Sequence, residues 1–373
     1  MELSSLGRLA VQHARNYLAE EVYLRAGADL TRPISFYGLV NERCNVHCRY
    51  CDFWRLDNYQ KEMSIEQWQH ALTSIQDFVG RYSISFSGGE PFMKKGFIEL
   101  LAWCRKQGIE AGVTTNGSAF SSKIVARTVA ARPLNVNISC DGPDAATHDY
   151  LRGWPGLFDT LSAGIGYLRA EQRAQGIDFP IVIKPTINQA NFRLLPAIVR
   201  WAERVGATAV NFQPMHRSTE ETYSELWVET PEDFADLERV TDELCEMHAR
   251  GHAIINTPEI LKLMGPHFRE ERAPAKIGAC RVGLRDFFIR TNGDVELCFF
   301  YPVVGNIREQ SAREIWYGEK ARTVRGETIG CDKLCLFTCL SQKTLTDKVK
   351  MGVKLLKAQR GHQSEIAAPM AQS

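Results

Sequence analysis

The 373-residue sequence has no excess of charge of either sign. Its 45 lysines and arginines are matched by 44 aspartates and glutamates, which leaves a net charge of +1. Nucleic-acid-binding domains usually carry a clear positive excess, so this balance gives no indication of a nucleic-acid partner. The sequence also has no apolar run of the roughly 18 residues that suggest a membrane span, and we therefore predict no transmembrane segment.

The N-terminus lacks the continuous apolar stretch of a secretory signal. Residues 1–30 are instead typical of an amphipathic helix that includes Glu20, Glu21 and Arg25. These features predict a cytoplasmic protein. The composition, 44% hydrophobic and 24% charged, is that of a globular chain with enough apolar material for a sizeable core.

From residue 33 to about residue 216, short apolar runs alternate with helical patterns. Ser64 and Gln67 have the spacing of a capping box, so one of the helices begins there. Repeated β/α units predict a parallel sheet with right-handed crossovers. The fold class is α/β, with a partial (β/α)6 barrel, because six units are too few for eight strands; ligands of such folds bind at the carboxyl ends of the strands. Strands are predicted over 34–40, 82–86, 111–115, 134–140, 180–187 and 207–213.

The pattern changes after residue 216. A helix is predicted from Thr230-Pro231 to about residue 250, and a second helical segment over 256–267. A small α+β module follows, with a β-hairpin around Asn292-Gly293 and a helix over 312–325. The predicted domains are an N-terminal helical extension over 1–33, the barrel over 34–230, a helical bridge over 231–275, a cysteine-rich module over 276–345, and a basic helix with a flexible tail over 346–373.

The eleven cysteines are the most informative residues. Cytosolic thiols stay reduced, so we expect no disulfide framework in a large chain without a secretory signal. Clustered cysteines in such a chain indicate metal or cluster ligation. Two groups are present: Cys44, Cys48 and Cys51, and then Cys280, Cys298, Cys331, Cys335 and Cys339.

The first group places three thiols within eight residues, directly after a predicted strand. One short loop of this kind can bind three corners of a four-iron cluster and leave the fourth iron open to chelate a small molecule. Structural zinc, with His47 as a fourth ligand, is the alternative.

Gly88, Gly89 and Glu90 follow the next predicted strand and should lie at the same end of the sheet. Paired glycines allow close approach to the backbone, and a glutamate can accept hydrogen bonds from an ammonium group. A surface turn would explain an isolated Gly-Gly-Glu-Pro sequence equally well. Its place one β/α unit after the three-cysteine loop favours a ligand site.

The pair of motifs, Cys44-x3-Cys48-x2-Cys51 and Gly88-Gly89-Glu90, resembles the radical S-adenosylmethionine (SAM) superfamily over roughly residues 34–215. The resemblance implies that the three cysteines, the catalytic centre, bind a [4Fe–4S] cluster whose open iron is chelated by SAM. It also implies that the Gly-Gly-Glu strip contacts the methionine amine and that Tyr50 lies near the adenine. Other positions that look like cofactor contacts are Thr115, Asn116, Ser139, Asp141, Arg152, Asn211 and Gln213, with the weaker Lys184.

The second cysteine group resembles the auxiliary-cluster modules called SPASM and twitch. Cys280 and Cys298 are separated by seventeen residues, and Gly293 lies five residues before Cys298. The full SPASM form normally has seven cysteines and two clusters, so the five here favour one auxiliary [4Fe–4S] cluster. Cys280 and Cys298 are its surest ligands, together with two of Cys331, Cys335 and Cys339. A four-cysteine zinc site is the alternative.

The resemblance implies a 5′-deoxyadenosyl radical that abstracts hydrogen from a substrate C–H bond. A single auxiliary cluster could accept the remaining electron, which favours a dehydrogenase of a small polar metabolite such as a sugar or an aminocyclitol. Flavodoxin or ferredoxin is the expected electron donor. Epimerisation, carbon–carbon bond formation and peptide maturation remain open, although residues 1–33 are too short for an independent leader-binding domain. A zinc-stabilised binding protein is the alternative outside radical chemistry.

Two further hypotheses concern single residues. Cys140 ends a predicted strand, and is either a buried small hydrophobe or a hydrogen-atom donor that faces the site. The segment after the sixth strand should line the substrate mouth, which makes Met215, His216, Tyr223 and Trp227 candidate lining residues.

Overall fold

The computed structural model describes residues 3–55, 61–216, 225–274 and 280–336. Its centre is a curved nine-stranded sheet with the order β11-β10-β9-β1-β2-β3-β4-β5-β7. The strands from β1 to β7 in this order are all parallel, which confirms the predicted partial barrel of six β/α units. These six strands are β1 (Ser35–Leu39), β2 (Ser83–Ser87), β3 (Glu110–Thr115), β4 (Val136–Ile138), β5 (Ile181–Ile183) and β7 (Ala209–Val210).

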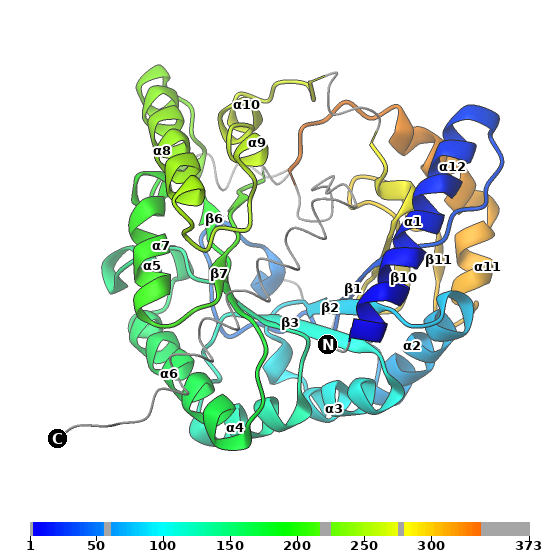
Figure 1. Ribbon diagram of the computed structural model, residues 1–373, viewed down its shortest axis with the longest axis horizontal. Helices are drawn as coiled ribbons and strands as arrows, with labels where there is room; N and C mark the ends of the chain where they lie inside the picture. Colours follow the sequence, from blue (N-terminus) through cyan, green and yellow to red (C-terminus); the bar gives the residue numbers. More distant parts are fainter. Residues whose placement is uncertain (1–2, 56–60, 217–224, 275–279, 337–373) are drawn as a thin grey trace.

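Beyond β5 and β7 the chain continues into two short strands that pair with each other, β6 (Thr186–Ile187) and β8 (Gln213–Pro214). Helices cover the outer face of the sheet (Figure 1), and they lie between successive strands along the chain. The helices of the barrel are α2 (Ile65–Val79), α3 (Phe97–Gln107), α4 (Ser122–Ala131), α5 (Ala145–Arg152), α6 (Leu157–Gln175) and α7 (Leu195–Arg204).

Helix α2 begins where the sequence predicts. Ser64 Oγ accepts a hydrogen bond from the Gln67 backbone N–H at 3.2 Å, and Gln67 Oε1 accepts one from the Ser64 N–H at 2.8 Å. Both bonds satisfy backbone donors that a helix N-terminus would otherwise leave without partners. The helix ends at Gly80, which has a φ of 81°.

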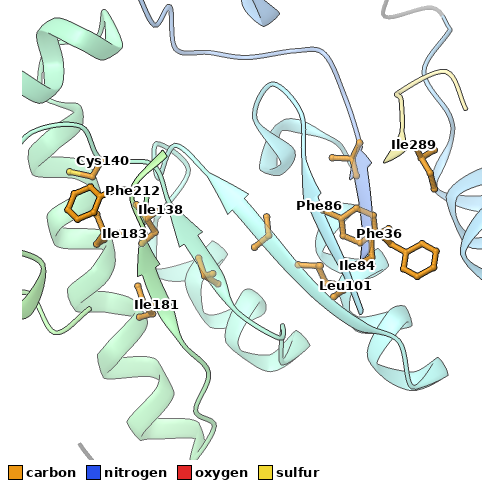
Figure 2. Packing of buried hydrophobic residues seen from close by; sticks show 14 of the residues in the cluster. Phe36, Ile84, Phe86, Leu101, Ile138, Cys140, Ile181, Ile183, Phe212 and Ile289 are labelled. Carbon is orange, nitrogen blue, oxygen red and sulfur yellow. The ribbon is translucent and has the colours of Figure 1, made fainter. Parts of the chain in front are cut away.

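Strand β2 shows how the sheet divides its two faces. Ile84 and Phe86 are buried against the helices (Figure 2), and the Phe86 ring lies 5.7 Å from that of Trp68 in α2. Because successive side chains alternate between faces, Ser83, Ser85 and Ser87 point to the inner side of the barrel. The inner face of this strand is therefore lined by hydroxyl groups.

Three helices follow the barrel: α8 (Pro231–Ala249), α9 (Pro258–Leu261) and α10 (Met264–Phe268). The predicted helix over 256–267 is thus two short helices, separated at Lys262-Leu263. None of the helices in the described part of the chain is both long and apolar enough to cross a membrane.

The cysteine-rich module continues the sheet of the barrel. It contains β9 (Asp286–Ile289), β10 (Asp294–Glu296), β11 (Gly305–Asn306), α11 (Ala312–Tyr317) and α12 (Glu319–Ile329). The predicted hairpin is present, and its strand β9 pairs in parallel with β1. The edge of β1 is thereby covered, so its backbone N–H and C=O groups are not left open to pairing with another chain. The single helix predicted over 312–325 is wrong, because Gly318 separates α11 from α12.

The N-terminal helix α1 (Leu3–Ala26) lies along this module (Figure 1). Glu20, which is fully buried, accepts hydrogen bonds from Arg281 and Arg285 at 2.7–3.0 Å. Asp29, after the helix, pairs with the buried Arg325 of α12. The predicted N-terminal extension is therefore bound to the cysteine-rich module by buried ion pairs.

Candidate functional site

The first cysteine loop leaves the end of β1 and lies within the carboxyl-end region of the sheet. Cys48 is buried, and Cys44 and Cys51 are half-buried. Burial, together with the neighbouring thiols, raises the pKa of Cys44 to about 11 and that of Cys51 to about 12. Such thiols become thiolates only when a bound cation compensates their charge.

Two side chains place N–H donors against the sulfur atoms of this loop. Asn116 Nδ2 lies 3.8 Å from Cys44 Sγ, and Arg152 Nη1 lies 3.6 Å from Cys48 Sγ. Hydrogen bonds to cysteine sulfur are among the features that tune iron–sulfur clusters. The loop therefore fits a [4Fe–4S] cluster held by three cysteines, although the assignment of each ligand stays a prediction.

Gly88 and Gly89 lie against the start of the cysteine loop. A Cβ atom on Gly89 would be 2.1 Å from the Arg43 carbonyl oxygen, and one on Gly88 would be 2.3 Å from the Asn41 carbonyl oxygen. Backbone hydrogen bonds join the same segments, from Gly89 N to Asn41 O at 3.0 Å and from Glu90 N to Arg43 O at 2.7 Å. The two glycines thus allow the chain's own backbone, rather than only a ligand, to approach closely.

The Glu90 carboxylate is fully buried and accepts three hydrogen bonds from the protein. The donors are the Thr115 hydroxyl at 2.8 Å, the Asn116 N–H at 2.7 Å and the Phe92 N–H at 3.1 Å. Burial raises the pKa of Glu90 to about 7, against these bonds, which lower it. Glu90 therefore fixes the end of β3 beside the cysteine loop, and its contact with a SAM amine stays a prediction.

Tyr50, Asp141 and Arg152 form one buried network. Arg152 Nε lies 2.7 Å from Asp141 Oδ2, and the Tyr50 hydroxyl donates to the same oxygen. The other carboxylate oxygen accepts the Thr186 N–H at 2.8 Å. Arg152 is thus shared between Asp141 and Cys48, which connects the end of β4 to the cluster loop. The contacts of these three residues with the cofactor stay predictions.

The remaining predicted contact residues lie at the carboxyl ends of the inner strands. Ser139 follows β4 and is half-buried, as are Lys184 after β5, Asn211 after β7 and Gln213 in β8. Their positions agree with the rule that ligands of parallel sheets bind at this end. Met215 and Trp227, by contrast, are only 2% and 5% exposed, so their side chains do not line an open mouth. Tyr223 lies outside the described residues.

The second cysteine group comes together from distant parts of the chain. Burial, together with the nearby Cys331 and Cys298 thiols, raises the pKa of Cys280 to about 11. Burial and the nearby Cys331 thiol also raise the pKa of Cys298. Cys335 is half-buried in the loop after α12, which also contains Cys331. Cys339 lies outside the described residues. At least three of the five predicted auxiliary ligands therefore converge.

Zinc was the alternative at both cysteine groups. Within the described ranges, no three His, Cys, Asp or Glu side chains are gathered tightly enough to hold one metal ion. Zinc requires thiolates about 2.3 Å from a single ion, whereas a multi-iron cluster is bound at separate corners.

Two family models match the chain. One, described as the Radical SAM superfamily, matches residues 39–189. The other, the SPASM iron–sulfur cluster-binding domain, matches residues 280–340, and together they match more than half of the chain. The chain belongs to the radical SAM superfamily. This radical SAM enzyme therefore has SAM, a SAM-binding [4Fe–4S] cluster and auxiliary cluster ligation as its cofactor set.

Similar proteins agree with this family. An "AdoMet-dependent heme synthase" from Nitratidesulfovibrio vulgaris is 29% identical over 295 residues, which cover 74% of this chain and 77% of the relative. The structure of Streptococcus suis SuiB bound to S-adenosylmethionine has a TM-score of 0.62 at 18% identity and covers 84% of this chain and 72% of SuiB. Native anSMEcpe with bound AdoMet and a peptide has a TM-score of 0.61 at 17% identity and covers 90% of this chain and 99% of anSMEcpe. The two structures show that the fold is shared.

The lone cysteines pack as small hydrophobic residues. Cys140 is fully buried, near Phe212 and Ile183 (Figure 2), and its thiol lies 3.2 Å from the Gly142 carbonyl oxygen. Burial raises the Cys140 pKa far above the usual range. Cys104 is fully buried in α3, and Cys245 is half-buried in α8. These positions favour the packing interpretation of Cys140 over a hydrogen-atom donor.

Sequence reasoning did not identify three residues that support the cysteine loop. Asn45 Oδ1 accepts a bond from Asn116 Nδ2 at 3.1 Å, and Trp54 Nε1 donates to the Cys48 carbonyl at 3.3 Å. His148 Nδ1 accepts the Asp141 N–H at 3.1 Å. Asn45 and Trp54 lie in or beside the motif, but only the folded loop shows which of its polar neighbours bind it.

Proposed function

We propose that this radical SAM enzyme is an oxidoreductase that removes hydrogen from a C–H bond of a small polar substrate, such as a sugar or an aminocyclitol. In this proposal Cys44, Cys48 and Cys51 hold the SAM-binding cluster. The two N–H donors against the sulfur atoms of this loop are the observation that supports it most directly. An auxiliary [4Fe–4S] cluster is held by Cys280 and Cys298, together with two of Cys331, Cys335 and Cys339.

The polarity of the barrel interior supports a polar substrate. Ser83, Ser85 and Ser87 line the inner face of β2. Half-buried Asn211 and Gln213 lie at the carboxyl end of the sheet, directly after β7 and in β8. Hydroxyl and amide groups can donate and accept hydrogen bonds, so they suit a ligand rich in hydroxyl or amino groups.

When bound, the first cluster and SAM supply a 5′-deoxyadenosyl radical that takes a hydrogen atom from the substrate, and an auxiliary cluster supplies an acceptor for the second electron. The chain itself binds and orients the substrate and excludes water. Loss of a hydrogen atom, one electron and one proton makes the whole reaction a two-electron oxidation. The electron that reduces the SAM-binding cluster comes from a small donor protein such as flavodoxin or ferredoxin.

The radical chemistry is tested on anaerobically reconstituted protein with SAM and dithionite. Iron, sulfide and zinc are counted, and 5′-deoxyadenosine is measured. The Cys44→Ala, Cys48→Ala and Cys51→Ala variants should each abolish 5′-deoxyadenosine. Cys245→Ala is the matched control, since this thiol lies in α8 away from both cysteine groups, and it should retain the wild-type yield. Zinc in place of iron, with no 5′-deoxyadenosine, would mean a binding protein.

The reaction outcome is tested with deuterated polyols and aminocyclitols. Oxidation transfers deuterium to 5′-deoxyadenosine and gives a product lacking two hydrogens. Epimerisation would instead replace the deuterium with solvent hydrogen and leave the oxidation state unchanged, which would contradict the oxidoreductase proposal.

A tetrapyrrole substrate is the second candidate. The observation that favours it is the relative named AdoMet-dependent heme synthase, whose match extends over about three quarters of both chains. Incubation with an iron porphyrin that carries carboxylate side chains separates the two candidates. A modified porphyrin, with no product from polyols or aminocyclitols, would select this candidate, and a modified peptide would select a peptide maturase.

A further inference from the structure

His267 in α10 joins two distant parts of the chain. Its side chain is buried, at 6% exposure. Nδ1 lies 2.7 Å from the carbonyl oxygen of Leu334, and Nε2 lies 2.9 Å from the carbonyl oxygen of Met215. One imidazole ring therefore spans the gap between these two backbone segments.

The two segments belong to the two ends of the proposed electron path. Met215 follows β8 directly, at the carboxyl end of the barrel. Leu334 lies between Cys331 and Cys335, in the loop that supplies auxiliary-cluster ligands. No other kind of residue at position 267 places two nitrogen atoms of one rigid ring between two carbonyl groups.

Backbone contacts beside His267 bind the same loop. Ala273 N donates to Asp332 O at 2.8 Å, and Arg272 forms an isolated antiparallel bridge with Lys333. The residues after α10 thus run along the Cys331–Cys335 loop, while His267 reaches across to the barrel. The loop is therefore held from α10 and the residues after it, as well as from its own module, where Lys333 lies over the Phe300 ring.

Aromatic side chains enclose the ring. Its centroid is 5.1 Å from that of His216, 5.6 Å from that of Trp227 and 5.3 Å from that of Phe268. Trp227 Nε1 in turn donates to the Phe268 carbonyl at 2.9 Å, which fixes the aromatic shell to α10. Packing on several sides restricts the rotamer of His267, so the ring acts as a rigid spacer.

The number of hydrogen bonds that the ring donates depends on its protonation state. The imidazolium donates from both nitrogens, whereas neutral imidazole donates from one. Burial lowers the pKa of His267, and the two carbonyl contacts and Glu270 raise it. Both states keep at least one donated bond and the aromatic packing, so the ring keeps its place between the two segments, although only the imidazolium donates to both carbonyl groups.

We propose that His267 is a positioning residue for the auxiliary cluster. It holds the Cys331–Cys335 loop at a fixed place relative to Met215, at the carboxyl end of the barrel. This inference rests on the proposed function, in which the auxiliary cluster accepts an electron from the substrate. Partners that orient metal ligands typically change metal affinity or activity by about 10–100-fold when they are replaced.

The first test measures the auxiliary cluster without turnover. In the full chain carrying Cys44→Ala, Cys48→Ala and Cys51→Ala, the auxiliary cluster is the one that remains for reconstitution. His267→Phe and His267→Gln are compared with His252→Gln, which replaces a partly exposed histidine paired with Glu203. We measure iron and sulfide per chain, chelator-dependent iron loss and the midpoint potential by EPR-monitored titration.

We expect His267→Phe to accelerate iron loss about tenfold or more and to shift the midpoint potential. His267→Gln, whose amide can still donate to one carbonyl, should lie between His267→Phe and the parent. His252→Gln should match the parent. Equal iron loss and equal potentials in all four proteins would overturn the proposal. If His267→Phe does not fold, as judged by thermal unfolding, the comparison of His267→Gln with His252→Gln decides the question.

The second test separates this inference from the proposed function. In otherwise wild-type enzyme, His267→Gln should lower the yield of oxidised product per 5′-deoxyadenosine, while 5′-deoxyadenosine formation without substrate stays unchanged. Cys280→Ala and Cys298→Ala should lower the same ratio. If the cysteine variants lower it and His267→Gln does not, the positioning role is wrong. If the cysteine variants do not lower it either, the oxidoreductase proposal itself is wrong.

Discussion

The Arg152 guanidinium and the Asp141 carboxylate form a 2.7 Å ion pair in which both side chains are almost completely buried. The same guanidinium lies 3.6 Å from Cys48 Sγ and above the Tyr50 ring. Burial would lower the pKa of Arg152, and the charges of Asp141, Tyr50 and Cys48 raise it well above its usual value. The end of β4, the end of α5 and the cysteine loop are thus connected through one buried cation.

Replacing Asp141 should therefore be costly. Asp141→Asn removes the charge that compensates Arg152, and breaking a buried pair in this way typically destabilises a protein by about 3–5 kcal/mol. The free energy of unfolding is measured by urea titration of the cluster-free protein. The control is Glu243→Gln, which breaks the exposed pair with Arg200 and should cost about 0–1 kcal/mol. Similar losses for the two variants would contradict the prediction.

Glu90 should make the cluster-free protein less stable as the pH rises from about 4.5 to about 7. Burial raises its folded pKa to about 7, so the folded state binds this proton more tightly than the unfolded state. The stabilisation is complete below the unfolded pKa and is lost as the pH rises through the folded pKa. It should amount to about 3 kcal/mol at most.

The measurement for Glu90 is the free energy of unfolding of wild type and Glu90→Gln at several pH values. The difference between the two proteins should change over this window, because the variant has no proton to bind at position 90. A constant difference from pH 4.5 to pH 8 would mean that the three hydrogen-bond donors outweigh burial.

Gly89→Ala should destabilise the cysteine loop. The added Cβ would meet the Arg43 carbonyl oxygen at 2.1 Å, so the backbone must move, at a cost of about 1–3 kcal/mol. The matched control is Gly166→Ala in the middle of α6, where no atom lies within 4 Å of the added Cβ. That variant should gain roughly 0.5–1 kcal/mol from helix propensity. Thermal unfolding compares them, and equal melting temperatures would contradict the close contact at Gly89.

Glu20→Ala should weaken the attachment of α1 to the cysteine-rich module. The variant leaves Arg281 and Arg285 without their buried partner, which should cost about 3–5 kcal/mol. Limited proteolysis should release the N-terminal segment faster, and auxiliary iron should be lost before iron of the first cluster. Glu21→Ala, at a more exposed position that also contacts Arg281, is the control and should have a much smaller effect. Unchanged cleavage in Glu20→Ala would show that α1 is held by other contacts.

Local structure could be predicted well where neighbouring residues determine it. The capping box at Ser64, the Asn292-Gly293 hairpin and the order of the six parallel strands are all present. Interactions of this kind involve residues close together in the sequence, so the pattern contains enough information to predict them. The break at Gly318 was missed because a glycine within a helical pattern either continues or interrupts it.

Within the candidate site, the motif residues could be named but not their partners. Tyr50, Asp141 and Arg152 were each predicted to contact the cofactor, and the folded chain brings them into contact with one another. Tyr50 lies 91 positions before Asp141, a separation that leaves no sequence signal for that network. The same holds for His267, which appears in no motif and is defined only by the two carbonyl groups beside its ring.

The sequence by itself determined the family, the two cysteine groups and the β/α repeat, because ligand spacing and hydrophobic periodicity are local properties of the chain. The tertiary structure decided that β9 extends the barrel sheet at β1, that Glu20 binds Arg281 and Arg285, and that His267 links Met215 to Leu334. Each of these contacts joins residues far apart in the chain. Their formation depends on the shape and burial of the complete fold, which no short stretch of sequence contains.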